Sequence, residues 1–179
     1  MTSISATSPW PTTITTSRLL LRPAEPTDVK EFTRLWTAPE ARRFLGGPVA
    51  EQELRVYQQH FANRPNVFAV TTRESMTVVG SVLIDAASRF GGRREVSYGL
   101  LPEHWGRGYA REAVAAVVDW ALANIPSDDP SVIAITQKAN VRSCQLLEAI
   151  GMSHVDSFVE FDAPQAMYSV DRQGLRLGQ

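Results

Sequence analysis

The chain has 179 residues, 44% of them hydrophobic and 21% charged, which is an ordinary balance for one folded domain with a sizeable core. Its 18 basic and 19 acidic residues leave a net charge of -1, which argues against binding nucleic acid through bulk positive charge. The single cysteine, Cys144, excludes an internal disulfide and fits a reducing compartment. No apolar run approaches the ~20 residues that a membrane-spanning helix needs, so we expect no membrane contact.

Residues 1–16 are rich in Ser, Thr and Pro, which predicts a flexible N-terminal arm ahead of a single domain over residues 17–179. The arm has neither the charged start nor the apolar centre of a secretory signal, so we expect a cytoplasmic protein. A short apolar strand follows at residues 18–22. A helix is predicted over residues 26–37, because Pro and Asp favour a first helical turn and apolar residues then recur at helical spacing.

The middle of the chain predicts a second helix and then a run of hairpin strands. A Gly-Gly-Pro break at residues 46–48 precedes a helix over residues 50–62. Three strand patterns follow, separated by the polar or glycine-bearing loops that are typical of hairpins. These strands cover residues 67–72, 78–85 and 95–100.

The last part of the chain alternates helices with strands. Residues 109–124 carry the strongest helical stripe, and residues 140–150 form a helix that ends on Gly151. The remaining strands cover residues 132–136, 153–161 and 166–171. Hairpins first and alternation later predict an α/β domain, with a central mixed, mostly antiparallel sheet of about seven strands and helices on both faces.

The segment from residue 95 to residue 114 is the most informative stretch. It reads as a strand, then a tight Gly106-Arg107-Gly108 turn, then a long apolar helix. A helix that opens in this way leaves backbone N–H groups uncovered at the positive end of its dipole, which favours a phosphate-bearing ligand. The alternative is a simple glycine turn between a strand and a helix.

Four ordered blocks of the sequence resemble the GCN5-related N-acetyltransferase (GNAT) superfamily, and within it the RimJ/RimL-like ribosomal-protein N-terminal acetyltransferases. The third block resembles the acetyl-CoA pyrophosphate loop, whose pattern is Gln/Arg-x-x-Gly-x-Gly/Ala, and the fourth resembles an Asn-x-x-Ser helix that ends in Gly-aromatic. Trp105 departs from the first pattern and Met152 from the second, but neither change removes a backbone phosphate donor. The blocks are residues 16–23, residues 35–36 with 43–47, residues 95–110 and residues 140–152.

The resemblance implies an enzyme that transfers an acetyl group from acetyl-CoA directly to a primary amine in a ternary complex, without a metal. The implied acceptor is a protein N-terminal α-amine. The alternatives are a small amine such as a polyamine, an aminoglycoside or an amino acid, or a non-catalytic acyl-CoA-binding module. A homodimer stays open, nucleic acid is not expected as a partner, and the three histidines have no metal-ligand spacing.

The resemblance also implies how the cofactor is bound. The strand at residues 95–100 should splay from the strand at residues 132–136, with pantetheine in the gap. Backbone groups of Leu100 and Leu101 would pair with pantetheine, and one N–H would serve as the oxyanion donor. The pyrophosphate would be held by backbone N–H groups and two arginines. The residues of this loop are Trp105, Gly106, Arg107, Gly108, Tyr109, Ala110 and Arg111.

Glu95 and Ser143 are the implied catalytic residues. Glu95 would act as the general base, directly or through water; the alternative is a surface glutamate paired with Arg93 or Arg94. These two arginines are expected to be solvated, the alternative being contact with an acidic acceptor. An N-terminal amine near pKa ~8 needs such a base less than a lysine near ~10.4. Asn140 and Ser143 are explained either as the cap and third residue of a helix, or as contacts to pantetheine and to the CoA sulfur, where Ser143 would protonate or stabilise the thiolate.

Three further side chains lie near these blocks. Trp36 and Phe44 are predicted either to be core residues or, by resemblance, to contact the acceptor. Cys144 adjoins Ser143, but neighbouring helix residues point about 100° apart, so we interpret this cysteine as a structural residue.

Overall fold

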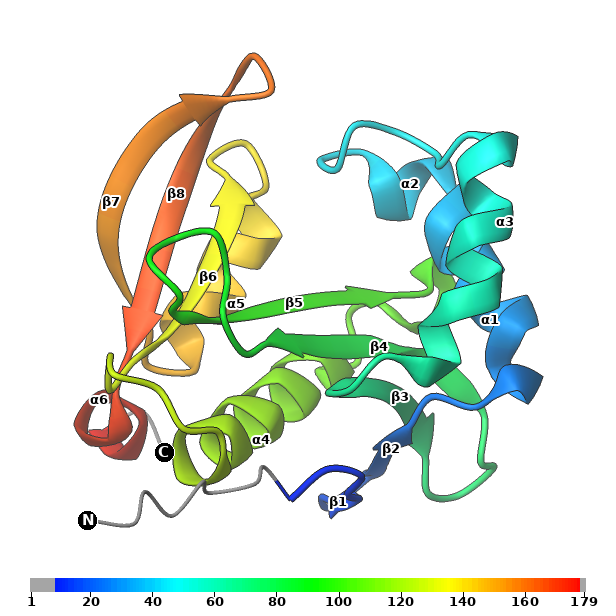
Figure 1. Cartoon of the computed structure of the whole chain (residues 1–179), viewed down its shortest axis with the longest axis horizontal. Helices are drawn as coiled ribbons and strands as arrows, with labels where there is room; N and C mark the ends of the chain where they lie inside the picture. The colour runs from blue at the N-terminus through cyan, green and yellow to red at the C-terminus, as the bar shows by residue number, and fades with distance from the viewer. Residues whose placement is uncertain (1–8, 178–179) are drawn as a thin grey trace, which may run out of the picture.

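The computed structural model describes residues 9–177 and contains one eight-stranded sheet in the order β1-β2-β3-β4-β5-β6-β8-β7 (Figure 1). Only the pair β5–β6 is parallel; the other neighbours are antiparallel. The strands are β1 Ile14–Thr15, β2 Leu19–Pro23, β3 Val67–Thr72, β4 Val78–Asp85, β5 Arg94–Leu100, β6 Val132–Gln137, β7 Ser153–Glu160 and β8 Ala163–Val170.

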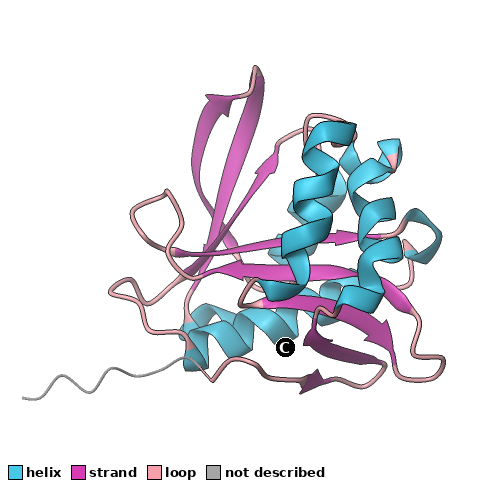
Figure 2. Cartoon of the chain, turned by 45° about the vertical axis from the view of Figure 1, so that its right-hand side comes forward, coloured by secondary structure: helices cyan, strands magenta, loops and turns pink. Residues whose placement is uncertain are grey.

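Helices cover both faces of this sheet (Figures 1 and 2). The larger apolar core joins the sheet to α4, α5 and α6, and a smaller one around Phe32 and Phe61 joins it to α1 and η2. Within residues 9–177 no helix has the length and apolar character to cross a membrane. The helices are η1 Pro26–Asp28, α1 Val29–Thr37, α2 Pro39–Arg42, α3 Glu51–His60, η2 Phe61–Asn63, η3 Pro102–His104, α4 Tyr109–Asn124, α5 Val141–Ala149 and α6 Arg172–Leu177.

The predicted α/β class, the mixed and mostly antiparallel sheet and its two helical faces are confirmed. The sheet has eight strands rather than about seven, because the two-residue strand β1 adds to one edge. Helices α2 and α6 were not predicted, since helices of four and six residues are too short to show a periodic apolar stripe.

Part of the predicted N-terminal arm is fixed to the body of the protein. The Trp10 ring packs against Phe68 and Trp120, with centroid distances of 5.0 and 6.4 Å. Ile14 and Thr15 then pair with β2. The expectation of a flexible arm therefore does not hold for Trp10 or for β1, because packing of a large, partly buried aromatic ring against the core outweighs the polar composition around it. Residues 1–8 of the predicted arm lie outside the described residues.

The feature that positions the site is the parting of β5 from β6. The two strands pair at only two positions, Arg94 with Val132 and Glu95 with Ile133. Beyond them β5 pairs only with β4, β6 pairs only with β8, and the strands diverge as the family resemblance implied (Figure 1). One sheet thereby acquires a fork in its middle.

The strands β4 and β5 approach closely at Gly80, and this contact tests the packing beside the fork. A Cβ on Gly80 would overlap the carbonyl oxygen of Gly99, whereas a Cβ on Gly99 would lie 3.9 Å from Leu35 Cδ2 in ordinary contact. We therefore expect Gly80→Ala to lower the free energy of unfolding by about 2 kcal/mol, as overpacking does. Urea denaturation measures this loss, and Gly99→Ala is the matched control with little effect. Equal stability of the two variants would contradict the close approach.

Candidate active site

Beyond the fork, β5 presents backbone groups that have no strand partner. Leu101 N–H donates to Val79 O at 2.9 Å, so Leu100 and Gly80 face each other without exchanging hydrogen bonds. The same alternation turns the N–H groups of Tyr98 and Leu100 away from β4, toward the space between β5 and β6. The Leu101 N–H is thus already used, and among the two leucines it is Leu100 whose N–H faces the gap.

The turn after β5 leaves the start of α4 open to a ligand. Gly106 and Gly108 have φ angles of +74° and +77°, a conformation that favours glycine. Gly108 is the N-cap of α4 and offers no capping side chain, and the Glu112 N–H is bonded to its carbonyl. The N–H groups of residues 109–111 come before this first hydrogen bond of the helix, so they have no partner within it and point out of its N-terminal end. This geometry fits a phosphate or pyrophosphate group.

Trp105 fastens this turn to β5. Its indole Nε1 donates to Leu100 O at 2.9 Å, and the Arg142 guanidinium lies 5.4 Å from the centre of its ring. Trp105 therefore braces the loop at the position where the superfamily pattern has Gln or Arg. Arg107 is exposed and forms no ion pair with any described residue, while Arg111 donates to the Ala149 carbonyl of α5 at 3.1 Å.

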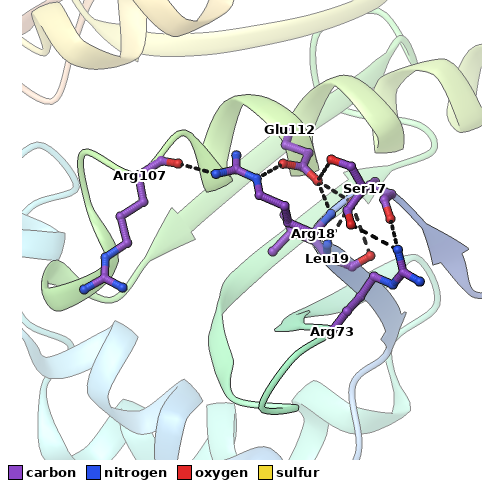
Figure 3. A network of polar contacts seen from close by, with 7 residues as sticks. Ser17, Arg18, Leu19, Arg73, Arg107 and Glu112 are labelled. Carbon is purple, nitrogen blue, oxygen red and sulfur yellow. Dashed lines mark hydrogen bonds and ion pairs between the residues drawn. The ribbon is translucent and has the colours of Figure 1, made fainter.

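A polar network ties the first turn of α4 to the β1–β2 turn (Figure 3). Arg18 Nε donates to Glu112 Oε2 at 2.7 Å, and Arg18 Nη1 donates to the Arg107 carbonyl at 2.8 Å. Thr16 and Ser17 hydroxyls and the Arg18 N–H donate to Glu112 Oε1. The loop is thus held from both sides. Sequence reasoning missed this pairing, because no local signal relates residues so far apart along the chain.

These hydrogen bonds control the charge of Glu112. Partial burial opposes its ionisation, but the hydrogen bonds from Thr16, from the backbone and side chain of Arg18 and from Ser17 outweigh burial and lower the Glu112 pKa to about 2. The carboxylate therefore stays ionised at the N-terminus of α4, where negative charge also favours the helix dipole.

Glu95 lies on β5 at the fork, directly opposite Asp85 of β4. It is half-buried, and burial followed by the nearby negative charge of Asp85 raises its pKa, against the pull of Arg89. A carboxylate whose pKa is raised toward neutrality is a better proton acceptor than a fully solvated one.

Neither neighbouring arginine forms an ion pair with Glu95, unlike the alternative drawn from the sequence. Arg93 donates to the Phe90 carbonyl and to Met167 Sδ. Arg94 is only 3% exposed rather than solvated, because strand alternation turns it to the face covered by α4. Its guanidinium donates to four carbonyl groups, those of Ala121, Ile125, Asp129 and Ser131.

Across the gap, Asn140 and Ser143 begin α5. Asn140 is the N-cap, and its Oδ1 accepts from the Ser143 N–H at 3.3 Å, so the capping interpretation is confirmed. The Ser143 hydroxyl lies 2.6 Å from the Tyr98 hydroxyl, which reaches it from β5. Tyr98 and Glu95 are three residues apart on one strand and therefore occupy opposite faces of the sheet. Tyr98 was not singled out from the sequence, because a tyrosine in a strand is normally expected to be a packing residue.

The other candidate side chains have structural contacts. Trp36 packs against the rings of Phe32, Tyr57 and Phe61, which agrees with the core interpretation. Phe44 lies half-buried after α2, with the Arg43 guanidinium 5.3 Å from its ring centre.

Comparison with known proteins places this chain in a family. Residues 18–153 match the family model described as the acetyltransferase (GNAT) domain, so the chain belongs to the GNAT family and is an N-acetyltransferase. Members of this family use acetyl-CoA. A curated relative, the uncharacterized N-acetyltransferase p20 of Bacillus licheniformis, is 24% identical over 145 residues, which cover 77% of this chain and 80% of that protein.

Two solved structures with the same fold are named for different acceptors. The spermidine N-acetyltransferase from Vibrio cholerae, in complex with CoA and spermine, has a TM-score of 0.75 at 17% identity, covering 90% of this chain and 99% of that one. The ribosomal-protein-S5-alanine acetyltransferase from Vibrio fischeri has a TM-score of 0.71 at 16% identity, covering 89% and 96%. This likeness shows the fold alone.

The Glu112 network makes stability depend on pH. The folded-state pKa of about 2 lies below the ordinary glutamate value near ~4.3, so the stabilisation is present above ~4.3 and is lost as pH falls toward 2. We expect Glu112→Gln to lower the unfolding free energy at pH 7 by about 1 kcal/mol, allowing for solvent screening of a partly exposed group.

Urea denaturation of both proteins between pH 7 and about pH 2 measures the difference. The control is Glu103→Gln, which removes an exposed carboxylate paired with Arg34 and should change stability less. A Glu112→Gln deficit that does not shrink in acid would show that the carboxylate charge is not the stabilising element.

Proposed function

We propose that this chain binds acetyl-CoA along β5 and transfers its acetyl group directly to the α-amine of a protein N-terminus, in the manner of the RimJ/RimL type. The observation that carries the proposal is the fork between β5 and β6, which ends at the uncapped start of α4. Unpaired N–H groups along one edge suit pantetheine, and bare helix N–H groups suit pyrophosphate. The residues present therefore fit the cofactor.

Bound acetyl-CoA supplies an activated acetyl thioester. Residues 109–111 would hold the pyrophosphate through their backbone N–H groups, with Arg107 and Arg111 adding charge. Asn140 would contact pantetheine from the start of α5. The Leu100 N–H faces the gap and would donate to the carbonyl oxygen as negative charge develops there.

Two side chains would handle the proton and the leaving group. Glu95 would accept the proton of the attacking amine, directly or through a water molecule. The carbon–nitrogen bond forms while the carbon–sulfur bond breaks, and sulfur keeps the electron pair. Ser143 would hydrogen-bond that sulfur.

The charges around Glu95 support an N-terminal amine over a polyamine. A polyamine carries several positive charges, which several free carboxylates would have to match. The carboxylates that influence Glu95 are Asp85 and Glu160, and Arg89 neutralises Glu160 through two hydrogen bonds. Trp36 and Phe44 would border the acceptor. The spermidine enzyme of the same fold keeps a small amine as the second candidate.

Introducing negative charge at the start of α4 tests cofactor binding. Ala110→Glu puts a carboxylate where its interaction with the helix dipole is favourable, so the variant should fold. The same carboxylate repels phosphate, so affinity for acetyl-CoA should fall by at least about tenfold. Ala123→Glu is the matched control, because it adds the same charge to the far end of the same helix. Calorimetry with acetyl-CoA measures both.

Intact binding by Ala110→Glu would place the cofactor elsewhere. No binding by the unaltered chain would overturn the proposal.

Glu95→Gln tests the base and the acceptor together. We expect kcat to fall about 10- to 100-fold and the acid limb of the pH–rate profile to disappear, since that limb reflects deprotonation of a glutamate with a raised pKa. Thiol release is followed with three acceptors: a peptide with a free N-terminus and no lysine, a peptide with a blocked N-terminus that contains lysine, and spermidine.

The free N-terminus should be preferred. Preference for spermidine would overturn the proposed N-terminal acceptor in favour of a small amine. An unchanged pH profile in Glu95→Gln would show that Glu95 is not the general base.

A further inference from the structure

A side-chain hydrogen bond crosses the fork and joins β5 to α5, the helix that follows β6. The Tyr98 hydroxyl from β5 and the Ser143 hydroxyl from α5 are 2.6 Å apart. Beyond Glu95 no backbone pairing joins β5 to β6, so this bond links the strand to the helix across the place proposed for the end of pantetheine. The ring of Tyr98 packs against the larger core, and this packing leaves the hydroxyl few positions to occupy.

We infer that Tyr98 is a positioning residue, whose hydroxyl fixes the Ser143 hydroxyl so that the serine proton points at the CoA sulfur. The inference rests on the proposed function and adds a residue to it. A serine O–H carries one proton and two acceptor lone pairs. When Ser143 Oγ accepts from Tyr98, its own proton is directed elsewhere, and the open side is the gap.

The 2.6 Å separation allows either hydroxyl to donate, and we assign Tyr98 as the donor because a phenol is more acidic than an aliphatic hydroxyl. Burial raises the pKa of Tyr98 to about 12, opposed by the hydrogen bond to Ser143, so the phenol keeps its proton at neutral pH and is available as the donor. The Ser143 N–H is already bonded to Asn140 Oδ1, which fixes the serine backbone. Both partners of the bond are therefore held in place.

The chemistry needs no net proton from either hydroxyl. As the carbon–sulfur bond breaks, sulfur takes the electron pair, and Ser143 donates a hydrogen bond to the thiolate. The proton of the amine leaves through Glu95 and water. Tyr98 then acts only by orienting Ser143, and a thiolate that receives this hydrogen bond is more stable than a free one.

The acidity of bound CoA measures this effect without an acceptor. The thiolate absorbance of CoA is titrated on the unaltered chain and on Tyr98→Phe, Ser143→Ala and the double variant. Thiol pKa on the unaltered chain should lie about 1 below the ordinary ~8.5. Ser143→Ala should lose this shift, Tyr98→Phe should lose at least about half of it, and the double variant should match Ser143→Ala.

Tyr168→Phe is the matched control, because its hydroxyl donates to Glu148 Oε1 rather than to Ser143. It should titrate as the unaltered chain does. Calorimetry should give CoA affinities within about threefold of the unaltered chain for Tyr98→Phe and Tyr168→Phe, since neither tyrosine is proposed to contact the cofactor.

A thiol pKa in Tyr98→Phe equal to that of the unaltered chain, with normal CoA binding, overturns the positioning role alone. A further loss in the double variant also overturns it, because Tyr98 would then act independently of Ser143. Failure of the unaltered chain to bind CoA overturns the proposed function and this inference with it.

Discussion

The rest of the site depends on the short pairing between β5 and β6. Unpaired backbone N–H groups inside a sheet are costly, and here those of Tyr98 and Leu100 are left facing the gap beside β5. Arg94 lies at the base of the fork and is buried there, with its guanidinium bonded to carbonyls of α4 and of the loop that leads to β6. These bonds fix the point at which the strands part. A ligand with its own donors and acceptors can then complete the edge.

The loop at the end of β5 depends on that geometry and on two braces. The Trp105 indole N–H donates a hydrogen bond to the Leu100 carbonyl, and the Arg18 guanidinium donates both to the Arg107 carbonyl and to the Glu112 carboxylate. The glycines supply the positive φ angles of the turn, and the braces fix where the turn lies. The start of α4 is therefore held at the mouth of the fork without a side chain covering its N–H groups.

Local patterns in the sequence predicted much of this structure. The α4 stripe, the Asn140 cap and the Gly106–Gly108 turn are encoded within a few residues, and each was found at its predicted place. The Arg18–Glu112 network and the Tyr98–Ser143 bond join residues that only tertiary packing brings together, so no spacing rule reveals them. Arg94 was misjudged because its charge suggested solvent while strand alternation determined its burial.

Amide hydrogen exchange followed by NMR, with and without acetyl-CoA, tests most directly that the fork is the cofactor site. We predict slower exchange at the N–H groups of Tyr98, Leu100 and residues 109–111 when acetyl-CoA is added, with little change at Leu101, whose N–H is already bonded to the Val79 carbonyl. Protection confined to other parts of the sheet, or none at a saturating cofactor concentration, would contradict it.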